Sequence, residues 1–425
     1  MTADVNSLLD TDVAPESSRW AAEPVPASKE EWVRRAREVA ELVRETAVDR
    51  DRDAAAPVHE IQLLKDARLL GIMGPAEHGG ADADWATTLA VVHQIAQVEG
   101  SLTNILGWHY AYFWLFRALG TDEQRRRWEA EVTSKQLLLS GIVNLRDAPL
   151  KAVDEGSDIV FNGFKSFNTG VPVCDLVFLC GIVEGGEGFG AFEGSNDFFA
   201  IAERRQPGIV LNDDWDMVGQ RSTASGTVKV KDVRVPWSNA IGFVGKKFQR
   251  RPANLSPGLT SQLLMATFYV GLARGALDQA VAYTREKSRP WLHSMYEQAV
   301  DEPHVVDGYG SLQSHLLAAE ALVQRATNEV RDTLLEPDEL TAERRSQLAS
   351  LVAAAKTVAS EVGLDVTTRV FEFTGARATA RSFGLDRYWR DLRTQSLHDP
   401  IGYKRRQVGA NLLTGAAPGP PDWYA

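Results

Sequence analysis

The chain has 425 residues, of which 44% are apolar and 24% charged, and its net charge is −11. This length exceeds the size at which a single hydrophobic core stops growing, so two or three packed regions are expected. The acidic balance argues against a nucleic-acid surface and favours a cytoplasmic protein. The sequence has no run of eighteen apolar residues and no signal peptide, which argues against membrane insertion and secretion.

The cysteines and histidines are not spaced as metal ligands. Cys174 and Cys180 lie six residues apart in an apolar run typical of a strand, which favours two buried thiols over a disulfide. The eight histidines are scattered, without His-x-x-x-His or Cys-x-x-Cys pairing. We therefore expect no metal.

The N-terminal part predicts a flexible arm followed by a helical block. Residues 1–27 mix Asp, Ser, Ala and Pro without periodicity, and a capping box at residues 28–31 begins the first helix. Further helices are predicted at 58–70, 85–98, 101–119 and 121–131. Residues 28–135 are therefore expected to form an N-terminal helical domain.

The helix predicted over 101–119 carries polar side chains within an apolar, aromatic sequence. Asn104 and Trp108 are one turn apart and share a face, and His109 follows directly. A buried asparagine needs hydrogen-bond partners. Core packing remains the simpler explanation for any one of these residues, because aromatic helices are usually core.

From residue 137 the periodicity changes from helical to alternating. Strands are predicted at 137–143, 159–161, 176–183, 198–201 and 228–235, separated by Gly, Asn and Asp turns. Residues 136–245 are therefore expected to form a central β domain. The glycines at 185–188 do not match a phosphate-binding fingerprint and predict a hairpin loop.

Two polar segments of the β region are candidate binding loops. Residues 162–170 predict a turn, a short strand and a second turn, which would leave the Asn168 and Thr169 side chains available for a ligand. Residues 212–226 are too polar for a core strand, yet they carry Trp215 and Arg221. An exposed loop and a binding loop explain this second segment equally well.

The C-terminal part returns to helical periodicity. Long helices are predicted at 261–287, 311–335 and 342–373, with a loop at 291–308, so residues 246–425 form a helical bundle. A later helix runs into Leu397-His398-Asp399-Pro400, where the proline ends it. A histidine there can face a cavity and exchange a proton, although a helix cap explains it as well.

The order of helical block, β region and helical bundle resembles that of the acyl-CoA dehydrogenase superfamily. Three of that family's landmarks are matched: the strand and turn beside the flavin at 165–170, an arginine segment at 284–289, and a glycine turn at 371–377. The resemblance implies an α+β fold with an N-terminal helical domain, a central β-barrel-like domain and a C-terminal four-helix bundle. It also implies a homotetramer.

Six shorter stretches resemble the two-component flavin monooxygenases of the dibenzothiophene monooxygenase type: 47–52, 100–102, 212–215, 269–278, 288–291 and 396–400. This resemblance implies that reduced flavin, FMNH2 or FADH2, reacts with O2 to give a flavin C4a-hydroperoxide that oxidises the substrate. The sequence shows no nicotinamide-binding fingerprint. A separate NAD(P)H-dependent flavin reductase is therefore implied as the source of reduced flavin.

The same resemblance assigns roles to individual residues. His398 would help to form or stabilise the hydroperoxide, and Thr169 would hydrogen-bond the reactive edge of the flavin. The flavin-binding residues would be Asn168, Thr169, Trp215, Arg221, Ser222, Thr223, Ser225 and Arg285. Arg285 would reach the phosphate or ribityl chain, including from a neighbouring subunit. The substrate pocket would be formed by Asn104, Trp108, Phe113, Ile142 and Gln395.

Several of these positions depart from the dibenzothiophene enzymes. Those enzymes have His, Tyr, Asn and His where this chain has Asn104, Trp108, Ile142 and Gln395, and they have Ser in place of Thr169. The substrate is thus left open among bulky aromatic or heteroaromatic molecules, dibenzothiophene-like or indole-like, oxidised at sulfur, nitrogen or carbon.

Two other interpretations remain open. An FAD-dependent acyl-CoA dehydrogenase or a nitroalkane-type oxidase would need a carboxylate base, for which Asp399 is the only nearby candidate because residues 254–272 contain no Asp or Glu. A helical scaffold that has lost its flavin is the alternative outside enzymes.

Overall fold

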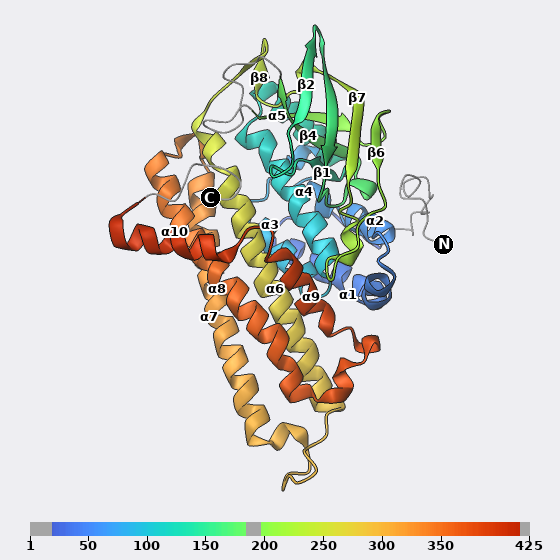
Figure 1. Cartoon of the computed structure of the whole chain (residues 1–425), viewed down its shortest axis with the longest axis vertical. Helices are drawn as coiled ribbons and strands as arrows, with labels where there is room; N and C mark the ends of the chain where they lie inside the picture. Colours follow the sequence, from blue (N-terminus) through green and yellow to red (C-terminus); the bar gives the residue numbers. More distant parts are fainter. Residues whose placement is uncertain (1–18, 184–196, 417–425) are drawn as a thin grey trace.

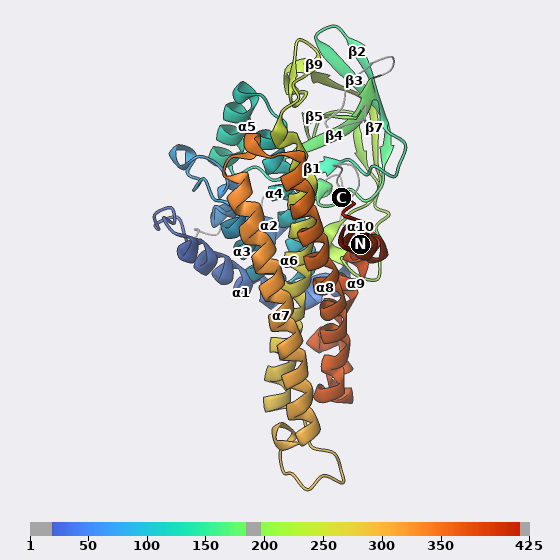
Figure 2. The same cartoon turned by 90° about the vertical axis from the view of Figure 1, so that its left-hand side faces the viewer.

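A helical block, a curled β-sheet and a second helical block follow one another along the chain in the computed structural model, which describes residues 19–183 and 197–416 (Figure 1). The sheet lies at one end of the molecule, and three long helices extend toward the other (Figure 2). The predictions for residues 1–18 of the arm and for the glycine loop at 185–188 fall outside the described residues.

The N-terminal block consists of five helices: α1 (Lys29–Asp53), α2 (Val58–Asp66), α3 (Trp85–Ala96), α4 (Gly100–Ala118) and α5 (Asp122–Lys135). The predicted capping box begins α1, where Ser28 Oγ accepts the Glu31 N–H at 3.3 Å. A second capping box begins α5, where Thr121 Oγ1 accepts the Gln124 N–H at 3.2 Å. These side chains satisfy N–H groups that have no partner within the helix.

The α2 helix ends before residue 70, contrary to the prediction, and α4 holds the turn that follows. The Tyr110 hydroxyl donates to Leu69 O at 2.6 Å, and His109 Nε2 lies 2.7 Å from Leu70 O. The Leu139 N–H donates to His109 Nδ1 at 3.0 Å, which fixes the proton on Nε2. Burial lowers the pKa of His109 to about 4. This imidazole is therefore a neutral structural link.

The β region is one curled sheet, a half-barrel. Its described strands are β1 (Leu139–Ile142), β2 (Leu150–Glu155), β3 (Asp158–Lys165), β4 (Leu176–Val183), β5 (Phe198–Glu203), β6 (Ile209–Leu211) and β7 (Val228–Pro236). The strand order is β1-β4-β2-β3-β7-β6, and β5 also pairs with β4. β4 runs parallel to β1 and β2 and antiparallel to β5. A small hairpin of β8 (Phe243–Val244) and β9 (Lys247–Phe248) follows.

The β region differs from the prediction in several details, among them β6, β8 and β9, which lie outside the predicted strands. β2 lies outside the predicted strands, because its second half is exposed and so interrupts the alternating pattern. The turn predicted at 162–163 is instead an irregularity within β3, where Gly163 has a φ of 140°. Cys174 lies in the turn before β4, not in the strand, although Cys174 and Cys180 are both buried free thiols.

The C-terminal block is built on α6 (Pro257–Glu286), α7 (Pro303–Leu334) and α8 (Ala342–Thr374), with α9 (Asp386–Gln395) and α10 (Ile401–Thr414) packed on α8. α7 begins earlier than predicted. Gly308, which the prediction took as loop, lies within this helix, and a Cβ there would lie 2.2 Å from the Phe373 ring, which explains a glycine at this position. None of the described helices is long and apolar enough to cross a membrane.

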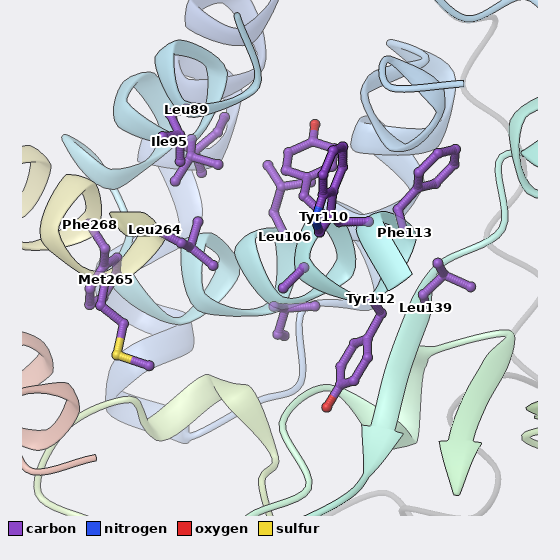
Figure 3. Close-up of a cluster of buried hydrophobic side chains, with 14 of the residues drawn as sticks. Leu89, Ile95, Leu106, Tyr110, Tyr112, Phe113, Leu139, Leu264, Met265 and Phe268 are labelled. Atoms are coloured by element: carbon purple, nitrogen blue, oxygen red, sulfur yellow. The ribbon is translucent and has the colours of Figure 1, made fainter. Parts of the chain in front are cut away.

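α4 is buried on nearly every side and contacts helices of both blocks as well as the sheet. A helix that is apolar all round requires such an environment. Figure 3 shows Tyr112 extending from α4 toward the sheet, while Phe113 points to a different side of the helix. The two faces of α4 therefore serve different parts of the molecule.

The contact between α6 and the end of α3 gives a stability prediction. A Cβ on Gly275 would lie 2.1 Å from Gln97 O, a backbone atom. We expect Gly275→Ala to lower the free energy of unfolding by about 1–3 kcal/mol, the usual cost of overpacking. Thermal unfolding of Gly310→Ala is the control, because a Cβ at this helical position in α7 meets no atom within 4 Å. An equal loss in both variants would contradict the prediction.

Candidate functional site

A cavity of about 720 Å³ opens between the sheet, α4 and α9. Seven of the predicted site residues line it: Asn104, Trp108, Thr169, Trp215, Ser225, Gln395 and His398. They come from four separate parts of the chain, so the fold brings together side chains that are far apart in sequence. The volume lies in the usual range for pockets that bind cofactors and small molecules.

One wall of the cavity joins α4 to the end of α9. Asn104 Nδ2 donates to Gln395 Oε1 at 3.1 Å, and the Tyr269 hydroxyl donates to Gln395 O at 3.1 Å. The Trp108 ring lies 5.6 Å from the His398 ring and 6.1 Å from that of Tyr112. This wall is mostly aromatic, with the His398 imidazole at its edge.

The Tyr112 side chain packs closely against the β1 strand at Gly141. A Cβ on Gly141 would lie 2.0 Å from the Tyr112 hydroxyl oxygen and 2.4 Å from Cζ. Gly141 and Val143 line the cavity, whereas the side chain of Ile142 between them is fully buried. Ile142 is thus placed outside the lining.

The opposite wall presents hydroxyl groups. Thr223 Oγ1 donates to Gln220 O at 2.8 Å, and Ser225 Oγ lies 2.7 Å from Thr223 Oγ1 and 3.1 Å from Thr169 Oγ1. Ser225 is the donor toward both hydroxyls, so Thr169 Oγ1 is an acceptor in this contact and the Thr169 hydroxyl proton remains available to a ligand. Ser140 Oγ donates to Thr169 O at 2.6 Å and fixes its backbone.

The polar segment 212–226 lines the cavity with Trp215, Met217, Val218, Gln220 and Ser225, which favours the binding-loop interpretation over a plain exposed loop. Trp215 Nε1 donates to Gln220 O at 2.8 Å, so the loop holds its own indole. Phe167 meets this indole edge to face at 5.7 Å. Phe167 also has a φ of 57°, a strained value for a bulky residue and one that is common at functional sites.

The remaining predicted residues lie outside the cavity lining. Phe113 is fully buried in the core, and Asn168 donates through Nδ2 to Lys165 O at 2.7 Å and Gly226 O at 2.9 Å. Asn168 thus holds the turn that presents Thr169. The sequence predicts that its side chain is available to a ligand, whereas in the structure this side chain binds the backbone.

Three residues of the short turn Arg221–Thr223 also have structural contacts. Arg221 Nε donates to Asp51 O at 2.8 Å, and Ser222 Oγ donates to Arg50 O at 3.2 Å. Thr223 supports Ser225 as described. Arg285 is exposed near the end of α6, outside this cavity, so its predicted role toward a flavin stays a prediction.

A buried charge cluster supports His398 from behind. His398 Nδ1 lies 3.4 Å from Asp399 Oδ1, which also pairs with Lys356 Nζ, and Lys404 Nζ lies 3.7 Å from Asp399 Oδ2. Burial opposes ionisation of Asp399, but the hydrogen bond from His398 and the charge of Lys356 outweigh it and hold the pKa of Asp399 well below its usual range. Burial lowers the pKa of Lys356 to about 8. An ionised Asp399 orients the imidazole with Nδ1 toward itself, which leaves Nε2 for other partners.

The cavity offers no free carboxylate base among the residues that the structure describes. Asp399 is buried in the ion pair just described, and Asp147 is the only carboxylate in the lining. Asp147 Oδ2 accepts the Ser166 N–H at 2.6 Å, the Ser166 hydroxyl at 2.8 Å and Asn144 Nδ2 at 3.1 Å. Both carboxylates are thus engaged in structural contacts, which disfavours them as the base that removes a substrate α-proton in an acyl-CoA dehydrogenase.

Sequence reasoning missed several lining residues: Tyr112, Arg146, Phe167, Gln220, Arg393 and Thr394. Phe167 and Gln220 lie within the segments 162–170 and 212–226, which the sequence already indicates as candidate binding loops, so their place in these loops was a usable signal. Arg393 is two residues before Gln395 on the same helix. Arg146 carries no local signal, because only the tertiary fold brings the loop after β1 to the cavity.

Comparison with known proteins divides the chain in the same way. The family described as acyl-CoA dehydrogenase, N-terminal domain, matches residues 26–136, and acyl-CoA dehydrogenase, C-terminal domain, matches residues 263–401. A dibenzothiophene monooxygenase from Rhodococcus erythropolis is 34% identical over 411 residues, which cover 93% of this chain and 96% of the relative.

Two solved structures share the whole architecture. Methanesulfinate monooxygenase MsuC from Pseudomonas fluorescens has a TM-score of 0.87 at 32% identity, covering 92% of this chain and 99% of that one. TdsC from Paenibacillus sp. A11-2, in complex with FMN and indole, has a TM-score of 0.85 at 30% identity, covering 93% of this chain and 100% of that one. The chain belongs to the acyl-CoA dehydrogenase family of flavoenzymes. Within that family it is a flavin-dependent monooxygenase of the group that contains dibenzothiophene monooxygenase.

A second buried carboxylate, Asp391, attaches α9 to the binding loop. Asp391 Oδ1 accepts the Gln220 N–H at 2.6 Å, and Gly100 lies so close that a Cβ there would be 2.5 Å from Asp391 Oδ2. Burial, with Glu99 nearby, raises the pKa of Asp391 to about 7 from its usual 3.8. The folded protein therefore holds this proton more tightly than the unfolded chain, and stability falls as pH rises between about 4 and 7.

We predict that Asp391→Asn removes part of this pH dependence, because the amide keeps an acceptor for Gln220 but cannot ionise. The difference between the free energies of unfolding of the variant and the wild type should increase as pH rises from 5 to 7, by at most about 1.4 kcal/mol for each pH unit. Urea unfolding at a series of pH values measures this difference. A difference that is constant over pH would show that the pKa of Asp391 is not raised in the folded protein.

Proposed function

We propose that the chain transfers one oxygen atom from O2 to a bulky aromatic or heteroaromatic substrate, using reduced flavin delivered by a separate NAD(P)H-dependent flavin reductase. The observation that carries this proposal is the cavity in which an aromatic wall with His398 faces the hydroxyls of Thr169 and Ser225. The dibenzothiophene and indole compounds named for the relatives indicate the substrate class.

The residues of the cavity fit a flavin. A flavin ring is flat and aromatic, with hydrogen-bonding atoms along one edge, and the cavity supplies aromatic surface at Trp215 and hydroxyls at Thr169 and Ser225. TdsC, which matches this chain over nearly its whole length, binds FMN, and this favours FMN over FAD. Thr169, Ser225 and Trp215 would hold the ring.

Bound reduced flavin supplies the two electrons with which one atom of O2 enters the substrate and the other leaves as water. The chain's own contribution is the environment. Trp108 and Tyr112 exclude water from the aromatic wall. His398, oriented by Asp399, can hold or deliver a proton through Nε2.

The absence of a nicotinamide-binding fingerprint from the sequence supports the separate reductase. Oxidation of NADH would then take place on the partner, and reduced flavin would reach this chain by diffusion. We further propose a homotetramer. Large apolar side chains are exposed in two regions, Leu292 and Met295 after α6 and Leu412 and Leu413 in α10, and such surfaces favour association.

The proposal predicts a product that depends on both components. The purified chain, a flavin reductase, FMN, NADH and 18O2 are combined with indole or dibenzothiophene, and mass spectrometry should find one 18O atom in the product. The chain without the reductase should not oxidise NADH. Rapid NADH oxidation by the chain alone would contradict the proposal. Reduction of the bound flavin by an acyl-CoA would contradict it as well.

His398→Ala serves as the matched variant in this experiment. It should fold, since the side chain lies at the end of α9 and is partly exposed, yet lose most of the product. His78→Ala is the control, because His78 lies in the short turn Ala76–His78, outside the cavity lining. Equal product from both variants would remove His398 from the mechanism.

The oligomer prediction is tested by light scattering after size exclusion. We expect the mass of four chains of 46.7 kDa. Leu412→Glu combined with Leu413→Glu places charge on the exposed face of α10 and should shift the mass toward smaller species if this face is an interface. A monomeric mass for the wild type would overturn the tetramer.

A further inference from the structure

Two arginines, Arg146 and Arg393, line the same cavity. Arg146 is exposed in the loop between β1 and β2, and Arg393 is half-buried on α9. Within the described part of the chain, neither guanidinium forms an ion pair or a hydrogen bond; the hydrogen bonds of these two residues are made by their backbone atoms, with Asn144 Oδ1 and Ser396 Oγ. A guanidinium that lines a cavity without a partner is able to bind an anion.

The other arginines of α9 show that this is unusual. Arg390 pairs with Asp51 and Asp386, at 2.6 Å and 2.8 Å, and Arg387 donates to Val98 O at 3.2 Å. These two arginines fasten α9 to the N-terminal block. Arg393, one turn further along α9, makes no such side-chain contact with the described residues and lines the cavity instead.

The two carboxylates at the cavity already have partners, and only one of them lies in the lining. The Asp147 carboxylate accepts three hydrogen bonds from Ser166 and Asn144 through one oxygen, and Asp399 is paired with Lys356. Lys165 adds positive charge beneath the loop of Arg146, where its Nζ donates to Asn144 O at 2.9 Å. In a chain of net charge −11, the cavity is therefore locally positive.

We infer that Arg146 and Arg393 form an anion subsite, and that the substrate is an aromatic molecule that bears a carboxylate, sulfinate or similar oxyanion. This inference rests on the proposed function and narrows its substrate class. Arg393 lies on the segment that also carries Gln395 and His398, so an anion held there would place the attached ring against the aromatic wall of Trp108. A flavin phosphate offers the same chemistry, and the experiment separates the two sources.

The test compares matched probes by equilibrium dialysis, with and without FMN. Indole and indole-3-carboxylate differ only in the anion, and riboflavin and FMN differ only in the phosphate. We expect the wild type to prefer indole-3-carboxylate over indole. Arg146→Gln and Arg393→Gln should each weaken the binding of indole-3-carboxylate at least about tenfold. The affinity for indole and the ratio of the FMN and riboflavin affinities should stay within about twofold of the wild-type values.

Arg126→Gln is the control, because it removes the same charge from an exposed position on α5 outside the cavity lining. An equal effect of this control, or equal binding of indole and indole-3-carboxylate by the wild type, would overturn the inference. Loss of the preference for FMN over riboflavin, with the probes unaffected, would assign the arginines to the flavin phosphate and overturn it as well. The dialysis experiment measures binding and needs no turnover. Failure of the oxygenation assay and failure of the anion subsite can therefore be told apart.

Discussion

The packing of α4 is the constraint on which the rest of the structure depends. The helix is buried over most of its circumference, so most of its faces must be covered by other elements. Its Tyr110 and His109 hold the turn after α2, and the Leu139 backbone at the start of β1 completes the contact. The remaining face, with Asn104, Trp108 and Tyr112, is left to the cavity. Core and site are thus two sides of one helix.

Buried charge follows a consistent rule around this helix. Arg50 lies against Glu60 and Glu99, Arg390 against Asp51, and Lys356 against Asp399. Burying an ion is costly unless a partner compensates, and removing one partner leaves the other exposed to the full penalty. The Arg390–Asp51 pair joins α9 to the N-terminal block, and Arg390 also donates to Val218 O of the binding loop at 3.1 Å, so this arginine fixes how the three parts meet at the cavity.

Much of the fold could be predicted from the sequence, because it is written in local patterns. The capping residues Ser28 and Thr121 mark helix starts, and the long helices of the C-terminal block have clear periodicity. β2 could not be predicted, because its outer half is solvated and lacks alternation. The start of α7 was missed because Gly308 resembles a helix breaker, whereas its role is to admit the Phe373 ring.

The site was predictable to a lesser degree, for a physical reason. His398, Thr169 and Trp215 stand in segments whose composition is unusual, and the cavity includes all three. Ile142 and Phe113 were placed in the pocket by resemblance, but strand alternation and the faces of α4 turn them into the core. Asn168 lies in the right turn and supports it from within. Which side of an element faces the cavity depends on its neighbours and is not visible in a local pattern.

The fit between Gly141 and Tyr112 has a consequence for how this cavity changes between related enzymes. The Tyr112 ring occupies the space that a side chain at position 141 would need, so one volume is shared by a strand and a helix. A larger residue at 141 is compatible only with a smaller one at 112. The residues at positions 141 and 112 should therefore vary as a pair in related enzymes, with their combined volume nearly constant. The width of this end of the cavity then depends on both residues together.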